Sequence, residues 1–250
     1  MNKFKISQIQ FQAKSIPLEN ANLLKNLFEK SQKFKPDLIC TPECSNIITN
    51  DKKHLFDYSY YQDNCPIIKI SKIFAKKNKV NINIGSLLLK IKGLKKLVNR
   101  SILINKTGKI QKIYDKINLF DVNISSLEKY RESHYFIKGN QLSVSKINGI
   151  KIGLTICYDV RFPNMYKQLA KKGAQIILLP AIGLNFACLS IVGQNYGALN
   201  FNRIREGYFT CLKYGIILLF FGGLLLYFGA GFFMHLFTSD EQVVRIGKEY

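Results

Sequence analysis

A cysteine at the end of an apolar segment is the first residue in this chain that is suited to chemistry. Cys157 stands in GLTICYDVRFP, where a predicted strand turns toward a helix. A thiol at such a turn can lie beside backbone N–H groups, which stabilise a developing oxyanion. A nucleophilic thiol also needs a proton acceptor and nearby positive charge. No histidine stands where it would serve as that base: His54 and His134 lie in polar segments and His235 in an apolar one.

Two charged residues in similar positions complete a candidate nucleophilic site. Glu43 follows an apolar strand in LICTPEC, and burying a carboxylate there is costly unless it is paired or functional. Lys116 follows an extended segment in IYDKINLFD and has the charge to pair with Glu43. Taken singly, a cysteine at a strand end is more often a buried structural thiol, and each of the two charges is more often a surface group at a strand end. Taken together, the three indicate a catalytic constellation.

The elements that must hold these residues alternate between strands and helices. Apolar patterning predicts strands over 4–11, 38–43, 81–89, 98–104, 109–114, 151–159 and 174–180. It predicts helices over 18–34, 66–78 and 163–172. The segment 105–108, Asn-Lys-Thr-Gly, predicts a hairpin between two of the strands. This alternation is typical of an α/β layered domain.

Four sequence blocks resemble the signature segments of the nitrilase (carbon–nitrogen hydrolase) superfamily, most closely its omega-amidase-like branch. The blocks are TPE, YDKINLFD, RESHYFIKGN and GLTICYDVRFP, in this order and within residues 3–181. The resemblance implies an α/β fold of the α-β-β-α sandwich type. One departure lies inside the blocks, because family members commonly have histidine where this chain has Asn118.

The resemblance also implies a role for each matching residue. Glu43 would be the general base, Lys116 the cation that stabilises the oxyanion and donates a proton, and Cys157 the nucleophile. Glu132 would position Lys116 and the substrate, and the backbone N–H of Tyr158 would complete the oxyanion hole. The expected reaction is hydrolysis of a small carboxamide to a carboxylate and ammonia through a thioester intermediate. It needs neither a metal nor an organic cofactor.

The resemblance ends after LLPA, so the predicted sandwich is truncated. The family continues with a Trp/His-bearing segment, an Arg-rich helix and at least two more strands. Residues 182–250 instead resemble part of a multidrug and toxic compound extrusion (MATE) transporter, through VGQNYGA, RIREG and LFTSDEQVVRIGKEY. Residues 214–238 contain no Lys, Arg, Asp or Glu and have the length of a helix across roughly 30 Å of hydrocarbon. We therefore expect a hydrolase domain over 1–181 and a fragment over 182–250 that attaches to a membrane.

The distribution of charge and the composition of the N-terminal segment indicate which binding partners and which cellular compartment to expect. The first 181 residues carry +20 of the formal net charge of +21, but their lysines are scattered, which argues against nucleic-acid binding. The N-terminus has no apolar core of a secretory signal. Arg203, Arg205 and Lys213 precede the apolar segment, which places its N-terminal side in the cytoplasm. We expect a cytoplasmic catalytic part anchored to the inner face of the cell membrane, and the resemblance implies a homodimer.

Three functional hypotheses remain open at this level. The first is an amidase that uses the four residues named above. The second is an inactive chimera, formed by rearrangement or misassembly of an amidase gene and a transporter gene. The third is a membrane-anchored binding module that keeps the pocket without turnover. Transport by this chain alone is not expected, because one or two spans cannot form an alternating-access pathway.

Overall fold

A computed structural model of the chain describes residues 4–123, 129–180, 201–235, 241–242 and 244. The chain divides into two compact units, Met1–Gly183 and Leu184–Tyr250, and each is described by itself. The expected domain boundary between residues 181 and 182 lies outside the described residues and stays a prediction.

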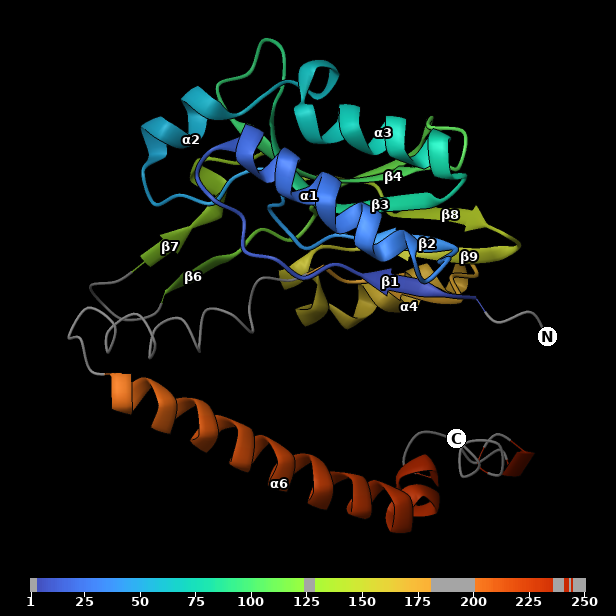
Figure 1. Cartoon of the computed structure of the whole chain (residues 1–250). Helices are drawn as coiled ribbons and strands as arrows, with labels where there is room; N and C mark the ends of the chain where they lie inside the picture. The colour runs from blue at the N-terminus through green and yellow to red at the C-terminus, as the bar shows by residue number, and fades with distance from the viewer. Residues whose placement is uncertain (1–3, 124–128, 181–200, 236–240, 243, 245–250) are drawn as a thin grey trace. The chain divides into compact units, whose positions relative to one another are not determined.

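A five-stranded mixed sheet forms the centre of the first unit (Figure 1), with the strand order β1-β2-β3-β4-β5. The strands are β1 (Ile6–Gln8), β2 (Leu38–Cys40), β3 (Asn81–Lys90), β4 (Leu97–Ile104) and β5 (Ile110–Asp115). The pairs β1–β2 and β2–β3 are parallel, whereas β3–β4 and β4–β5 are antiparallel. The predicted hairpin joins β4 to β5, and the N–H of Gly108 donates to the carbonyl oxygen of Asn105 at 2.8 Å. The strand expected over 4–11 is shorter in the structure.

A second, three-stranded sheet has the order β10-β9-β8. Its strands are β8 (Ser143–Ile147), β9 (Ile150–Leu154) and β10 (Ile176–Leu178). β8 and β9 form a hairpin whose turn residues, Asn148 and Gly149, have φ of 47° and 90°. A separate two-stranded ribbon consists of β6 (Asp121–Asn123) and β7 (Lys129–Arg131). The sequence patterns used above predicted neither β8 nor this ribbon.

Proline marks the start of three helices in the first unit. The α-helices are α1 (Pro17–Gln32), α2 (Lys52–Tyr58), α3 (Pro66–Asn78) and α4 (Pro163–Lys171). Pro17, Pro66 and Pro163 each stand in the first turn, where the missing proline N–H would have no helical acceptor. Short 3₁₀ helices are η1 (Gln62–Asn64), η2 (Glu132–His134) and η3 (Cys157–Arg161).

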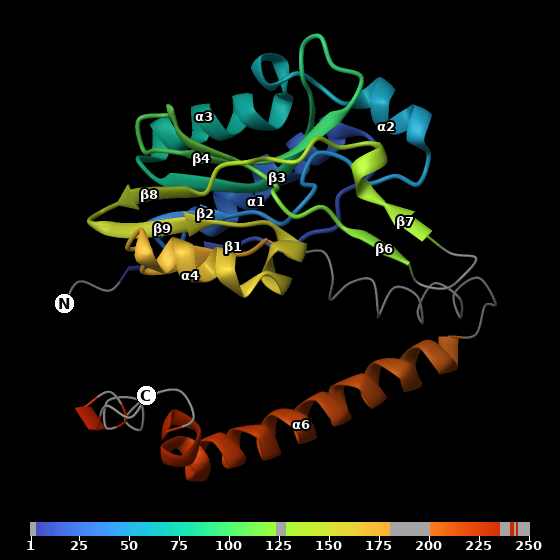
Figure 2. The ribbon, with the colours of Figure 1, turned by 180° about the vertical axis from the view of Figure 1, so that it is seen from behind.

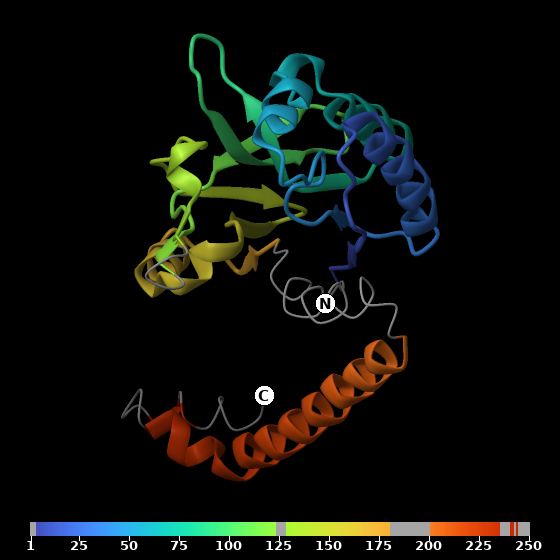
Figure 3. The ribbon, with the colours of Figure 1, turned by 90° about the vertical axis from the view of Figure 1, so that its left-hand side faces the viewer.

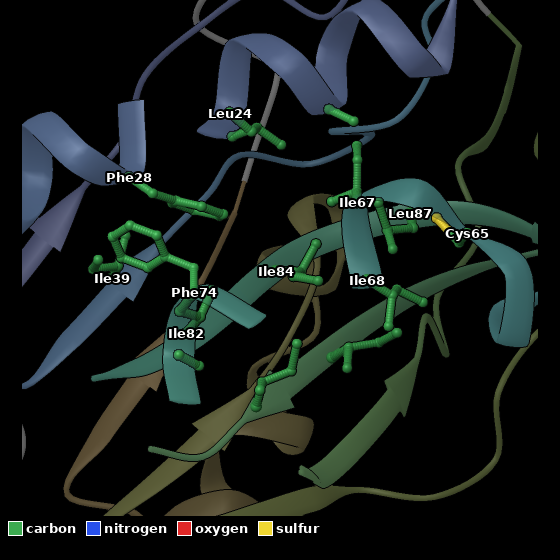
Figure 4. Close-up of a cluster of buried hydrophobic side chains, with 14 of the residues drawn as sticks. Leu24, Phe28, Ile39, Cys65, Ile67, Ile68, Phe74, Ile82, Ile84 and Leu87 are labelled. Carbon is green, nitrogen blue, oxygen red and sulfur yellow. The ribbon is translucent and has the colours of Figure 1, made fainter. Parts of the chain in front are cut away.

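The elements stack as helix, sheet, sheet and helix. α1 and α3 cover one face of the five-stranded sheet, and α4 lies beyond the three-stranded sheet (Figures 1 and 2). Side chains on β4 alternate between two cores: Ile102 and Ile104 pack with α1 and α3, whereas Leu103 packs with residues of β9 and α4. Figure 4 shows the first core, in which Leu24 and Phe28 of α1 lie above the sheet. This order of layers agrees with the predicted α-β-β-α sandwich.

The second unit contains the long helix α6 (Phe201–His235), drawn in orange to red in Figure 3. A membrane span was expected over residues 214–238. Within the part of the chain that the structure describes, no helix combines the length and the apolar character needed to cross a membrane. The expected span therefore has no support in the structure.

Candidate active site

A buried ammonium group between two carboxylates forms the centre of the candidate site. The Nζ of Lys116 lies 3.0 and 3.1 Å from the two carboxylate oxygens of Glu132 and 3.4 Å from Oε1 of Glu43. All three side chains are buried. Burial by itself lowers the pKa of Lys116, but the charges of Glu43 and Glu132 and the Glu132 hydrogen bond outweigh it, so the pKa is raised overall. Lys116 is therefore an ammonium ion held by two carboxylates.

Each member of this triad follows an element of secondary structure. Glu43 lies just beyond β2, and the backbone N–H of Thr41 extends the sheet by donating to the carbonyl oxygen of Asn83 at 3.0 Å. Lys116 directly follows β5, and its own N–H donates to the carbonyl oxygen of Asn99 at 2.9 Å. Glu132 opens η2. The sheet thus fixes the backbone on both sides of the Glu43–Lys116 pair.

The turn that bears Glu43 packs closely against a glycine of β3. The N–H of Gly85 donates to Oγ1 of Thr41 at 3.1 Å. A Cβ atom at position 85 would lie 2.0 Å from the carbonyl oxygen of Thr41 and 2.5 Å from that of Pro42. Any other residue at this position would push back the segment that leads into Glu43.

Replacing Gly85 by alanine is therefore expected to lower the free energy of unfolding by about 1–3 kcal/mol, the usual cost of overpacking. Urea titration measures this change. Gly153→Ala is the matched control in a strand, because its Cβ would lie no closer than 3.4 Å to a neighbour. A Gly85→Ala variant as stable as wild type would contradict the close approach of β3 to the Glu43 turn.

Cys157 begins η3 directly after the second sheet. Its N–H donates to the carbonyl oxygen of Pro180 at 2.9 Å, and its φ is +44°. A residue with a side chain rarely adopts this left-handed backbone, and such strain clusters at functional sites. The half-buried Cys157 is within electrostatic range of Lys116, because the sulfur's charge is one of the causes that raise the pKa of that lysine. The structure thus brings the predicted nucleophile into the electrostatic environment of the triad.

The residue after Cys157 is Tyr158, whose backbone N–H was expected to bind an oxyanion. Within the described residues, this N–H donates no backbone hydrogen bond. The phenol ring packs edge-on against Phe120, with 4.9 Å between ring centroids, and against Phe162. The N–H therefore has no competing backbone acceptor in the part of the chain described.

A fully buried carboxylate links the Lys116 segment to the Cys157 turn. One oxygen of Asp159 accepts hydrogen bonds from the hydroxyl of Tyr114 at 2.6 Å and from the N–H of Ile156 at 2.8 Å. The other oxygen accepts from the backbone N–H of Asn118 at 3.1 Å and from its Nδ2 at 2.8 Å. Burial, followed by the charge of Asp159, raises the pKa of Tyr114, so the phenol stays a donor. Tyr114 and Asn118 flank Lys116 along the chain, so Asp159 fixes the distance between the two segments.

The side chain of Asn118, at the position where the family commonly has histidine, thus donates a hydrogen bond to Asp159. We expect Asn118→Ala to lower the free energy of unfolding by about 1.5–3 kcal/mol, the range for hydrogen bonds to charged groups. Asn118→His, which restores a ring N–H donor, is expected to recover most of that loss. Chemical denaturation of the two variants measures both effects. Equal stability of the alanine and histidine variants would rule out the side-chain bond as the cause.

Three residues at the site were not singled out in the sequence. Asp159 stands inside a quoted block but received no role, and Asn99, in β4, donates from Nδ2 to Oε1 of Glu43 at 3.0 Å. Cys44 also has a left-handed backbone, with φ of +53°, and burial, followed by the charge of Glu43, raises the pKa of its thiol. Its position directly after Glu43 was the one available sequence signal. Polar residues within strands give no such signal, because their partners lie far away in sequence.

Comparison with known proteins places this chain in a family. The family model described as carbon-nitrogen hydrolase matches residues 6–193, and a second model, MatE, matches residues 167–250. A deaminated glutathione amidase of Dictyostelium discoideum is 34% identical over 189 residues, which cover 72% of this chain and 65% of the relative. An omega-amidase of Xenopus tropicalis is 27% identical, with coverages of 72% and 64%.

Solved structures agree with the fold. The crystal structure of the Caenorhabditis elegans NitFhit protein superposes with a TM-score of 0.66 at 25% identity, over 75% of this chain and 47% of that protein. An amidase from Nesterenkonia gives a TM-score of 0.60 at 22% identity, over 71% and 64% of the two chains. The chain spans 53–65% of the length of the first curated relatives it matches. Its first unit has the nitrilase-type α/β fold, and the chain belongs to the carbon–nitrogen hydrolase family.

Proposed function

We propose that the first unit is a cysteine-dependent amidase that hydrolyses a small carboxamide to a carboxylate and ammonia. The observation that carries the proposal is the buried triad of Glu43, Lys116 and Glu132. Cys157 lies close enough for the charge of its sulfur to interact with Lys116. A base, a fixed cation and a thiol are the groups that acyl transfer from an amide requires. The names of the relatives, deaminated glutathione amidase and omega-amidase, support a small amide as substrate.

In the first half-reaction, Glu43 takes the proton of the Cys157 thiol and the sulfur attacks the amide carbon. One oxygen of Glu43 already accepts from Asn99 and Lys116. Both of these hydrogen bonds fall on Oε1, so the other oxygen, Oε2, is the atom suited to take the proton. The Lys116 ammonium and the Tyr158 N–H stabilise the oxyanion. Lys116 then gives a proton to the departing nitrogen as the C–N bond breaks, and Glu43 returns one to Lys116 across their contact.

In the second half-reaction, water hydrolyses the thioester. Glu43 takes a proton from the water as its oxygen attacks the thioester carbon. The C–S bond then breaks, Glu43 returns its proton to the sulfur of Cys157, and the product acid leaves as a carboxylate after giving its proton to solvent. Glu132 reacts with nothing in this scheme: it positions Lys116 through two carboxylate oxygens, one of which also accepts from the N–H of Phe120.

The test is ammonia release from succinamate and butyramide by the purified full chain, combined with intact mass measured after acid quenching. We expect ammonia from at least one amide and an acyl adduct that maps to Cys157. Absence of ammonia from both amides would overturn the proposal. An adduct at Cys157 would exclude a binding module without chemistry.

A second candidate is an inactive chimera of an amidase and part of a transporter. In this proposal residues 214–238 attach the chain to a membrane, as the sequence suggests. The observation in its favour is that the hydrolase match and the MatE match meet and overlap at residues 167–193. One long sequencing read across codons 175–190 tests whether both parts lie on one DNA molecule. Fractionation of cells that express the chain, with alkaline carbonate washing, tests the membrane attachment. Light scattering of the purified chain tests the homodimer that the resemblance implies.

A further inference from the structure

Asn99 on β4 touches both charged partners of the candidate site. Its Nδ2 donates to Oε1 of Glu43 at 3.0 Å, and its backbone carbonyl oxygen accepts from the N–H of Lys116 at 2.9 Å. The residue is only 1% exposed. Lys116 also donates to this oxygen, from Nζ at 3.4 Å.

The other end of this amide is unsatisfied. Oδ1 of Asn99 is buried and has no hydrogen-bond partner among the described residues. An amide flip would not repair this, because it would place Oδ1 against a carboxylate oxygen of Glu43, which offers no proton when ionised. A buried acceptor without a partner costs stability, so such a group in a folded protein calls for a functional explanation.

We propose that Asn99 is a positioning residue for the general base. Its N–H and the Lys116 ammonium both hold Oε1 of Glu43, which fixes the carboxylate so that Oε2 faces the Cys157 thiol. The structure tolerates the unsatisfied Oδ1 because the opposite end of the same amide makes this contact. The inference rests on the proposed role of Glu43 as the base.

The deciding variant is Asn99→Leu, which keeps the branched shape but removes the donor and the unsatisfied oxygen together. We expect kcat to fall about 10- to 100-fold, the effect of one hydrogen bond to a charged group. KM is expected to stay within about twofold, because the lost contact touches the base and not the substrate. The melting temperature is expected to be unchanged or higher. Alkylation of Cys157 by iodoacetamide is expected to slow, and we expect the same in Glu43→Gln.

Asn46 provides the matched control, since it is a fully buried asparagine whose amide is satisfied at both ends. Its Nδ2 donates to the carbonyl oxygen of Leu88 at 2.8 Å, and its Oδ1 accepts from the N–H of Leu88 at 2.9 Å. Asn46→Leu is expected to lower the melting temperature. Measured well below that temperature, its kcat and its Cys157 alkylation rate should match those of wild type.

The outcomes separate this inference from the proposed function. Wild-type kcat and alkylation rate in Asn99→Leu would overturn the inference, and so would a fall in melting temperature like that of Asn46→Leu without slower alkylation. If the wild-type chain releases no ammonia, the proposed function fails, but the alkylation rates still decide on Asn99. Slower alkylation of Cys157 in both Asn99→Leu and Glu43→Gln supports the positioning role, whereas slower alkylation in Glu43→Gln alone refutes it.

Discussion

Replacing Cys157 by alanine is expected to abolish amide hydrolysis, with a fall in kcat on the order of 10⁶-fold, as when a nucleophile is removed from a catalytic unit. Without the sulfur no thioester forms, and the remaining groups act only on a bound water. Ammonia release and the acyl adduct should disappear together. The fold should persist, because alanine occupies the same turn with the same backbone strain.

The control for this prediction is Cys65→Ala, which removes a thiol from the core between α3 and the first sheet. That variant should lose some stability through the small cavity but keep its activity. Ammonia release by Cys157→Ala at more than a trace of the wild-type rate would refute the assignment of Cys157 as the nucleophile. A melting temperature far below that of wild type would instead show that the thiol supports the turn.

Replacing Lys116 by methionine is expected to have two large effects. Loss of an oxyanion donor lowers the rate by about 10²- to 10³-fold. Loss of the cation leaves Glu43 and Glu132 as neighbouring buried carboxylates, and breaking a buried ion pair in this way costs about 3–5 kcal/mol of stability. Denaturant titration and ammonia release, measured below the melting temperature, follow the two effects separately.

A second substitution separates stability from catalysis at this site. Glu132→Gln, added to Lys116→Met, removes one of the two unpaired charges and is expected to recover part of the lost stability. It should recover no activity, because the oxyanion donor is still missing. Equal recovery of rate and stability would mean that Lys116 contributes to folding alone.

The sequence predicted regular elements well wherever local patterning was strong. α3 was expected over 66–78 and has those bounds, and β3 extends one residue beyond its expected end. The hairpin between β8 and β9 was missed although its turn, Asn148-Gly149, is the pairing that favours tight hairpins. β6 and β7 are only three residues long, too short for a two-residue period to stand out.

The candidate site likewise contains residues that the sequence predicted and residues that it did not. Glu43, Lys116 and Glu132 could be anticipated because they follow recognisable blocks, and the structure places them within hydrogen-bond reach of one another. Asn99 and Asp159 could not, since a polar residue in a strand or turn looks the same whether it faces solvent or a partner far along the chain. Their partners lie 56 and 45 residues away, on Glu43 and Tyr114. Strand pairing within the five-stranded sheet brings Asn99 to Glu43, and the packing of the two sheets brings Asp159 to Tyr114.

The charge balance of the buried triad bears on how a turnover would end. One ammonium lies between two carboxylates, so the ionised set carries a net negative charge in a region with little solvent. A neutral amide group enters such a region without electrostatic penalty, whereas the newly formed carboxylate of the product is repelled by Glu43. The triad would thus favour dissociation of the acid product and keep product inhibition weak.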